Sequence, residues 1–494
     1  MRAEDPAALI RRAQEHYGSG RVGEARAELE AALRLQPGHA PAWMMLGIVL
    51  YAEGRFEESA ASHARAIALR PAFAEAHDSR GSALAALGRW DEAITEHERA
   101  VAADPRYAHA HSNLGLAYRA RGRLDEARAS FGRALAIEPA HAEAMHNLGF
   151  LLEDEGRWDD AMALYRRALE RNPNLARAGY NLGLAHLRRH EFARGWPLAE
   201  SRFDTVPPMT PRRGPGVPAF TAGDWAQGHR LAVWSEQGVG DQILFSTLLP
   251  ELEARGQDFV AEVDARLRPA FARAHPHWKL TARDGADAAF AECDRQVALG
   301  SLPLLLRPDP ASFGAQPRAL LAADAQRAAT YRARFPADAR VVGISWRSFQ
   351  SGARAQVANA KSAPLAAFAP LARHVRLLDL QYGDTAQERA AFARAGGELT
   401  HFDDLDLFGD LDGVLAAIAA CDAVVTTSNV TAHLAGALGK RTLLVFLKGV
   451  APFHYWVPGP DGHSLWYPSV EIAGDAGIDT WEKALARADE LLAR

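Results

Sequence analysis

Small and apolar residues recur with a fixed period over the first third of the chain. Alanine, glycine and proline each return every 34 residues, a spacing that predicts a repeated pair of short helices. The small residues let the two helices pack closely, and the proline ends the second helix before the next unit begins. The periodic sets are Ala32, Ala66, Ala100, Ala134 and Ala168; Gly47, Gly81, Gly115, Gly149 and Gly183; and Pro37, Pro71, Pro105, Pro139 and Pro173.

A Gly-Arg pair with the same period predicts the turn inside each unit. With this pair, four positions agree in register, and the chain resembles the tetratricopeptide repeat family over five units from Pro6 to Leu175. A partial sixth unit fades after His190. The resemblance implies an α-solenoid with a concave groove lined by the first helix of each unit. The pairs begin at Gly20, Gly54, Gly88, Gly122 and Gly156.

The inner face of the expected groove carries one asparagine in each of three consecutive repeats. Asn113, Asn147 and Asn181 each stand in the sequence Asn-Leu-Gly. An amide offers both a donor and an acceptor, so this ladder can hold the backbone of an extended peptide. It resembles the ladder of the O-linked N-acetylglucosamine transferases, which implies a protein acceptor. The alternative is that the amides only satisfy polar groups within and between helices.

After the repeats the pattern changes to a proline-rich linker and then to strands alternating with helices. The apolar run Arg230–Trp234 predicts a buried strand, and apolar residues at helical spacing follow it from Ile243 to Leu252. Val341–Trp346 starts a second series of the same kind. Alternating strands and helices predict parallel sheets covered on both faces. We expect repeats over 6–203, a linker over 204–228, a first α/β half over 229–320 and a second over 321–494.

Further elements are expected at intervals through both halves. Arg307–Asp338 is expected to be less ordered. The expected strands are 259–263, 278–280, 296–299, 375–380, 399–402, 423–427 and 442–446, and the expected helices are 266–274, 385–395, 411–420, 430–438 and 480–492.

Each half contains a strand, a polar loop and a helix start in direct succession. In the first half Gly238 and Gly240 are expected to let the backbone turn tightly, with Asp241 at the helix start. In the second half Ser428 or Asn429 is a natural N-cap. Free N–H groups at a helix start bind anions, and ligands of such sheets bind where the strand order reverses. The two halves together predict a ligand cleft.

These motifs resemble the GT-B glycosyltransferases related to the lipopolysaccharide heptosyltransferases, over roughly Arg230–Arg494. The resemblance implies an inverting, metal-independent transferase with two Rossmann-like halves. Similar domains joined to tetratricopeptide repeats include flagellin glycosyltransferases. The residues that carry the resemblance are Gly240-Asp241, Gly343-Ile344-Ser345-Trp346-Arg347, Ala432 to Gly439, and Trp466-Tyr467-Pro468-Ser469.

The resemblance assigns roles residue by residue. Asp241 matches the base that activates the acceptor hydroxyl, and Thr427 to His433 match the loop that binds the phosphates of the nucleotide sugar. The heptosyltransferase pattern has aspartate where this chain has Ser428. The identity of the donor, including ADP-heptose, is therefore open, although removing a negative charge beside phosphates favours anion binding.

The residues themselves leave several alternatives. Asp241 is either the base or an N-cap that only fixes the loop, and Glu236 competes for the role of base. The departing phosphate needs cations or N–H groups. Each candidate cation could instead be a solvated surface charge. His433 could instead be a buried histidine that is hydrogen-bonded to the backbone. The donor-side candidates are Arg347, Lys361, Thr427, Ser428, Asn429, Val430, Thr431 and His433.

An aromatic group near the C-terminus has two interpretations as well. Phe453, His454, Tyr455, Trp456, Trp466 and Tyr467 could stack on a base or sugar, or pack a C-terminal extension onto the core.

Composition narrows the functional classes. A net charge of −5 in 494 residues, with no basic stripe, argues against nucleic-acid binding. No run of about 18 apolar residues and no signal peptide occur, so we expect a cytoplasmic protein without a membrane span. Cys293 and Cys421 stand far apart with no Cys-x-x-Cys motif, and we interpret both as small buried apolar residues. Asp403–Asp406 is better interpreted as a helix-capping loop than as a metal site, and neither metal nor cofactor is expected.

The leading hypothesis is a glycosyltransferase whose repeats recruit a protein and whose α/β part transfers a sugar from a nucleotide sugar to Ser or Thr, as on flagellin. One alternative is a transferase of heptosyltransferase type acting on a glycan or lipid-linked acceptor. Another is a repeat scaffold whose transferase fold is inactive, for which Ser428 is the main argument.

Overall fold

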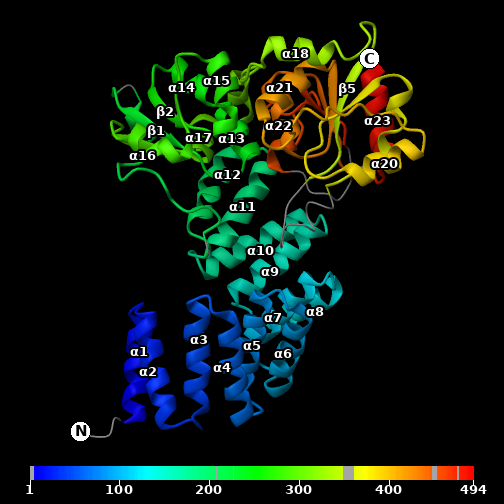
Figure 1. Cartoon of the computed structure of the whole chain (residues 1–494). Coiled ribbons are helices and arrows are strands. Elements are labelled where there is room, and N and C mark those ends of the chain that lie inside the picture. Colours follow the sequence, from blue (N-terminus) through cyan, green and yellow to red (C-terminus); the bar gives the residue numbers. More distant parts are fainter. Residues whose placement is uncertain are drawn as a thin grey trace. The chain divides into compact units, whose positions relative to one another are not determined.

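The computed structural model describes residues 5–206, 208–225, 227–348, 361–447, 453–474 and 478–493. The chain divides into two compact units, Met1–Asn181 and Leu182–Arg494 (Figure 1). This division falls before the expected end of the repeats at 203, because the last repeat helix packs on the α/β part. There the indole N–H of Trp196 donates to the carbonyl of Arg307 at 2.8 Å. None of the described helices has both the length and the apolar character needed to cross a bilayer.

Paired antiparallel helices build the first unit, as the 34-residue period predicts. Each turn inside a pair has its glycine in the left-handed region, with φ between 74° and 76°. In the sixth repeat His190 takes that conformation, with φ 58°. The helices of the first unit are α1 (Pro6–Gly18), α2 (Val22–Leu35), α3 (Ala40–Ala52), α4 (Phe56–Leu69), α5 (Ala74–Ala86), α6 (Trp90–Ala103), α7 (Ala108–Ala120), α8 (Leu124–Ile137), α9 (Ala142–Asp154) and α10 (Trp158–Arg171). Helix α11 (Ala176–Arg188) begins in the first unit, and α12 (Phe192–Ala199) belongs to the second.

In the second to fifth repeats, a glycine on the first helix lies against a ring from the second helix of the same repeat. A Cβ on Gly115 would lie 2.6 Å from Cε1 of Phe131, closer than packed atoms approach. The periodic glycines therefore fix how closely the paired helices pack. The pairs are Gly47 with His63, Gly81 with His97, Gly115 with Phe131 and Gly149 with Tyr165.

Four parallel strands form the first sheet of the second unit, in the order β3-β2-β1-β4. Leu231 of the central strand pairs with Phe259 on one side and Arg295 on the other. The elements are β1 (Arg230–Trp234), α13 (Val239–Ser246), α14 (Leu249–Ala254), β2 (Asp258–Glu262), α15 (Arg268–Ala274), β3 (Lys279–Thr281), α16 (Ala286–Phe290), β4 (Arg295–Ala298) and α17 (Leu302–Leu306).

Five parallel strands form the second sheet, in the order β6-β5-β7-β8-β9. The expected strand at 399–402 is wrong, since only Thr400 forms an isolated bridge, to Leu378. The span expected to be less ordered contains α18, and β9 was not expected. The elements are α18 (Ala325–Arg332), β5 (Val341–Ser345), β6 (Arg376–Asp379), α20 (Ala386–Arg394), α21 (Leu411–Ala420), β7 (Ala423–Thr426), α22 (Val430–Ala437), β8 (Thr442–Leu444), β9 (Val470–Ile472) and α23 (Trp481–Ala493).

The proline-rich linker lies against the first sheet. Its described residues from 208 to 218 form neither helix nor strand, as expected. Its end is tied to β4, because Gln296 N–H donates to Pro218 and Phe220 N–H donates to Gln296. Earlier in the linker, Arg213 donates to the carbonyl of Ser235 at 2.5 Å. The linker is thus attached to the loop that follows β1.

Candidate functional site

Both sheets have a point where the strand order reverses, and the sequence motifs follow the strands at these points. In the first sheet the reversal lies between β1 and β4, and in the second between β5 and β7. The loop after β1 leads into α13, and the loop after β7 leads into α22. Helices α13 and α22 pack against each other, as Figure 1 shows near the centre of the α/β part. The two motif loops therefore belong to one region.

The loop after β1 differs from the tight glycine turn that we expected. Gly238 is extended, with φ −85° and ψ 172°, and the left-handed residue is Gln237, with φ 61°. A non-glycine residue held there costs about 1–3 kcal/mol. Gly240 has a different role, because a Cβ on it would lie 2.9 Å from Cδ2 of His433. Its lack of a side chain lets α13 approach α22.

Glu236 is committed to a buried ion pair. Its carboxylate accepts from Nε and Nη2 of Arg202, at 2.9 and 2.6 Å, and from the N–H of Gly300 at 3.1 Å. Both residues of the pair are 3% exposed. A carboxylate held this way anchors the loop, and it is poorly placed to take a proton from a substrate.

Asp241 lies in the first turn of α13 and is half-buried. Burial, and then the charge of Arg188, lower the pKa of Lys361 in the second half, and the negative charge of Asp241 partly opposes this shift. Burial and then the charge of Asp241 raise the pKa of Tyr467 well above its ordinary value. Of the two predicted acids, Asp241 is therefore the one that interacts electrostatically with Lys361 and Tyr467 of the second half.

Lys361 is a buried cation in the same region. The residue is 7% exposed, and Nζ lies 3.4 Å from the ring centroid of Phe453. Burial, and then the positive charge of Arg188, lower its pKa to about 8, against the opposing effect of Asp241. At neutral pH the ammonium remains mostly charged, so it can attract an anion without competition from bulk water.

The loop before α22 is organised by Asn429. As N-cap, it accepts the N–H of Thr431 at 3.0 Å. Its Nδ2 donates to Oγ of Ser345 at 2.8 Å and to the carbonyl of Arg347 at 3.3 Å. The ends of β5 and β7 are thereby joined. Ser428 and Val430 beside it are half-buried, whereas Thr427 is fully buried.

Arg347 follows β5 and is largely held by protein groups. One Nη donates to the carbonyl of Asp384 at 2.9 Å, and the other lies 3.4 Å from a carboxylate oxygen of Glu388. The side-chain amide oxygen of Gln381 accepts its backbone N–H at 2.6 Å. Of the predicted cations, Lys361 is therefore less neutralised by carboxylates than Arg347.

His433 lies in an aromatic enclosure on α22. Its Nδ1 is hydrogen-bonded to the hydroxyl of Tyr467 at 3.1 Å, and its ring centroid lies 4.9 Å from that of Trp456. Burial lowers its pKa to about 3, so the ring is neutral. It packs the junction of the halves through Gly240, and its hydrogen-bond partner is a side chain and not the backbone.

Most of the C-terminal aromatic group is core. Trp456, Trp466 and Tyr467 are no more than 2% exposed, whereas Phe453 is 43% exposed and lies beneath Lys361. The packing interpretation therefore holds for the three buried rings. Phe453 remains available to a ligand.

The predicted asparagines each bond to the preceding repeat. Nδ2 of Asn113 lies 3.1 Å from both carboxylate oxygens of Asp78, 35 residues back. Asn147 donates to Ser112 at 3.3 Å, and Asn181 is bonded to His146 at 3.2 Å. All three are only half-buried. Asn147 also accepts a hydrogen bond at its Oδ1 from His146 at 3.1 Å. The ladder therefore exists as an inter-repeat network.

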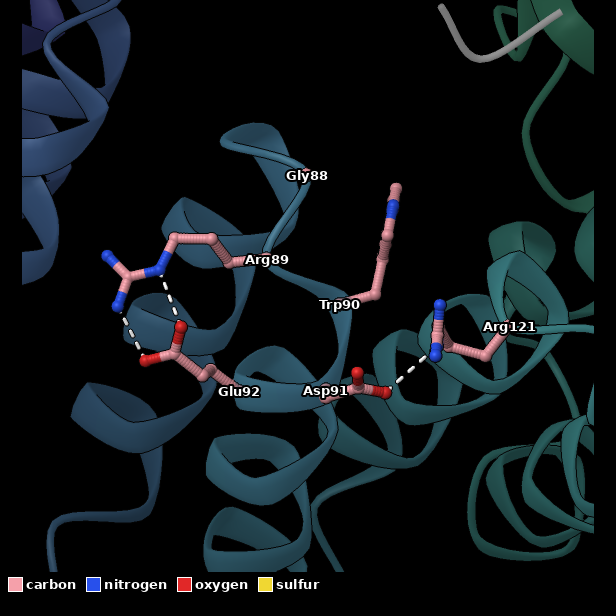
Figure 2. A pocket seen from close by; sticks show the side chains of 6 residues that line it. All are labelled: Gly88, Arg89, Trp90, Asp91, Glu92 and Arg121. Atoms are coloured by element: carbon pink, nitrogen blue, oxygen red, sulfur yellow. Dashed lines mark hydrogen bonds and ion pairs between the residues drawn. The ribbon is translucent and has the colours of Figure 1, made fainter. Parts of the chain in front are cut away.

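A separate hollow of about 150 Å³ lies at the turn before α6 in the first unit. Figure 2 shows the Trp90 ring between two ion pairs, Arg89 with Glu92 and Arg121 with Asp91. Because both cations that line it are neutralised, this hollow has no net attraction for an anion.

Comparison with known proteins identifies the first unit. Models of the tetratricopeptide repeat match residues 10–76, 81–119 and 106–174. The N-terminal part is therefore a tetratricopeptide repeat domain. Two solved structures are similar to it. The protein TTC0263 of Thermus thermophilus is 27% identical, the match covers 37% of this chain and 100% of that chain, and the TM-score is 0.34. MamA of Desulfovibrio magneticus is 24% identical, the match covers 34% of this chain and 97% of that chain, and the TM-score is 0.31.

A curated relative extends the similarity beyond the repeats. Protein FlbA of Caulobacter vibrioides is 33% identical over 316 residues, which cover 59% of this chain and 51% of FlbA. The chain thus spans about half the length of this relative. Since 59% of the chain is longer than the unit Met1–Asn181, the match must include part of the second unit.

Two positions of the candidate site were not predicted from the sequence. Arg202, which anchors Glu236, carries no sequence signal, because nothing marks an arginine in a terminal helical turn as buried. Gln381 had a detectable signal. It is a polar residue directly after a buried strand, where ligand-side residues of parallel sheets occur.

Proposed function

We propose that the chain is a glycosyltransferase that moves a sugar from a nucleotide sugar to a protein held by its repeats. The observation that carries the proposal is the electrostatic interaction between Asp241, on α13 in one half, and the buried Lys361 in the other half, where α13 also packs against α22. An acid that can take a proton beside a cation that can hold a phosphate is what this transfer needs.

In the proposed reaction Asp241 takes the proton of the acceptor hydroxyl as its oxygen bonds to the anomeric carbon. The bond from that carbon to the donor phosphate breaks, and the phosphate leaves with the electron pair. Lys361 and the N–H groups at the start of α22 stabilise the negative charge. Glu236 and Arg202 hold the loop that presents Asp241.

A catalytically inactive scaffold is the second candidate, and one observation favours it. Asn429 already occupies the N–H of Thr431, and its own Nδ2 is bonded to Ser345. Fewer free donors therefore remain at the start of α22 for a phosphate.

The test is transfer and hydrolysis with a panel of nucleotide sugars, including CMP-linked nonulosonates. We expect Asp241→Asn to lower kcat by a factor of about 10²–10⁴ with nucleotide affinity unchanged. Asp287→Asn is the matched control, because Asp287 lies in the first turn of α16 and is exposed. Binding of no donor at all would leave the scaffold, and full turnover in Asp241→Asn would remove Asp241 as the base.

A further inference from the structure

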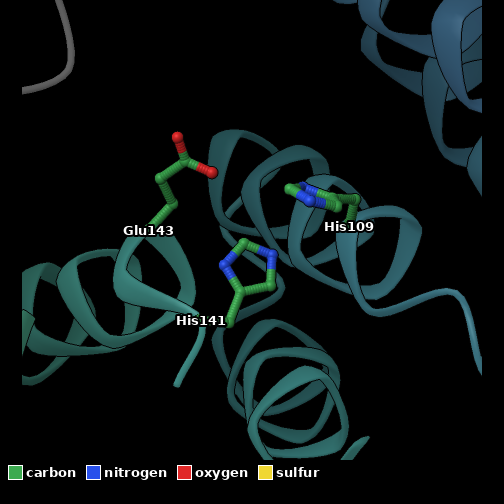
Figure 3. A group of neighbouring side chains, drawn as sticks. All are labelled: His109, His141 and Glu143. Carbon is green, nitrogen blue, oxygen red and sulfur yellow. The ribbon is translucent and has the colours of Figure 1, made fainter. Parts of the chain in front are cut away.

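Three metal-ligating side chains meet at the junction of the fourth and fifth repeats, far along the chain from the transferase motifs. They are His109, the second residue of α7, His141, the N-cap of α9, and Glu143, the second residue of α9. One ligand atom from each lies within 4.8 Å of the others. Figure 3 shows the two imidazoles side by side, with the carboxylate of Glu143 on the same side of the helices.

His141 supplies a second, independent sign of a ligand. The residue is 4% exposed, and its Nε2 is buried without a hydrogen-bond partner among the residues that the structure describes. Its ring centroid lies 4.4 Å from that of His109. A buried polar atom without a partner costs about 1–3 kcal/mol, so this nitrogen is expected to have one.

From these contacts we propose that His109, His141 and Glu143 bind a divalent transition-metal ion of the zinc type. Two imidazole nitrogens and a carboxylate oxygen form a donor set that Zn²⁺ accepts, with the fourth position open to water. The ion bridges the first helices of two successive repeats. Metal–ligand bonds of about 2.0–2.1 Å require the three atoms to close by roughly 1.5 Å. The side chains of His109 and Glu143 are exposed, so they can rotate inward.

The hydrogen bond that His141 already makes decides what metal binding costs. Its Nδ1 accepts the N–H of Ala144 at 3.4 Å, which places the ring proton on Nε2. Coordination through Nε2 moves that proton to Nδ1 and gives up this long capping bond. A lost cap costs about 1 kcal/mol, much less than three metal–ligand bonds provide.

The repeats offer their own comparison positions. His39 stands where His141 does, three repeats earlier, and its Nδ1 also caps a helix, at Ala42. Pro41 replaces Glu143 there, so no ligand set forms. Glu75 stands where Glu143 does, two repeats earlier, but Phe73 takes the place of His141 at the cap of that helix. Across the five repeats, the three ligand types coincide at this junction alone in the sequence.

The proposal is tested on the full chain after dialysis against a chelator. Zn²⁺ alone is titrated calorimetrically, and Co²⁺ alone is followed by its visible absorption. We expect one site, weakened about tenfold or more in His109→Ala and in Glu143→Ala. His39→Asn and Glu75→Ala, the matched controls, are expected to bind like the wild type.

Both ligand variants change exposed side chains, so the fold does not depend on them. His141→Asn keeps a capping oxygen and is expected to lose the same binding. Absence of a wild-type site, or equal affinity in the ligand and control variants, overturns the proposal. The readout is metal affinity, so it stands or fails separately from sugar transfer.

Discussion

Lys361 shows how burial gives one side chain a measurable signature. Its pKa of about 8 lies below the ordinary 10.5, so the folded protein holds this proton less tightly than the unfolded chain. Between pH 8 and pH 10.5 the unfolded chain binds more protons. The free energy of unfolding therefore rises with pH between these values, by at most roughly 3 kcal/mol. Below pH 8 the destabilisation caused by burying the charged ammonium is constant.

We therefore predict that Lys361→Met is more stable than the wild type below pH 8, and that the difference shrinks toward pH 10.5. The measurement is the denaturant midpoint of the second unit from pH 7 to pH 10.5. Lys279→Met is the control, because the Lys279 side chain is 54% exposed. A wild-type-to-variant difference that does not depend on pH would contradict the shifted pKa.

At the residue scale the sequence identifies candidate catalytic side chains, but it does not identify the residues that bond to them. Asp241 and Glu236 are five positions apart and look alike as candidate bases. The difference between them is Arg202, which neutralises Glu236 from a segment that carries no motif. Ion pairs between distant segments depend on packing that no local pattern encodes. The two acids therefore separate only in the structure.

At the scale of elements the sequence was most informative where periodicity was strong. The 34-residue period located the helix pairs of the repeats, and α21 matches its expected bounds of 411–420. The expected strand at 399–402 was wrong because alternation over four residues cannot distinguish a strand from an extended edge segment. Short strand β9 was missed for the same reason, since its three residues give too brief a pattern.

The periodic glycines allow a test of helix packing. We predict that Gly115→Ala destabilises the repeat unit by about 1–3 kcal/mol, because the new Cβ collides with the buried ring of Phe131. Gly132→Ala is the matched control on α8. It has no neighbour within 4 Å, so alanine there is expected to stabilise the helix by about 0.4–1 kcal/mol.

Thermal unfolding followed by far-ultraviolet circular dichroism reports both substitutions. Opposite shifts in Tm support the close-packing role of the period. Equal shifts in the two variants would mean that the glycines are periodic for another reason.

At the scale of the molecule, the residues proposed to bind the acceptor and those proposed to bind the donor lie in different units. The asparagine ladder lies within Met1–Asn181, and Asp241, Lys361 and α22 lie within Leu182–Arg494. Similarity to FlbA covers part of the second unit. Acceptor capture and donor chemistry should therefore respond to different substitutions.

The last prediction uses this division. Replacing Asn113, Asn147 and Asn181 together by alanine is expected to raise the KM for a protein acceptor, with flagellin the first to test, by roughly tenfold or more. Each lost hydrogen bond contributes about 0.5–1.5 kcal/mol. Hydrolysis of the donor in the absence of acceptor is expected to be unchanged, since the donor-side residues lie in the other unit.

Stability must be measured with these variants, because each asparagine also bonds to the preceding repeat. Loss of Asn113 removes a donor from the buried carboxylate of Asp78, which His97 also contacts at 2.8 Å, so Tm is expected to fall. Asn174→Ala, at an exposed position outside the helices, is the control. A lower Tm with an unchanged acceptor KM would assign the ladder to repeat packing alone. A raised KM in the triple variant, at a temperature where it remains folded, would assign these asparagines to acceptor binding.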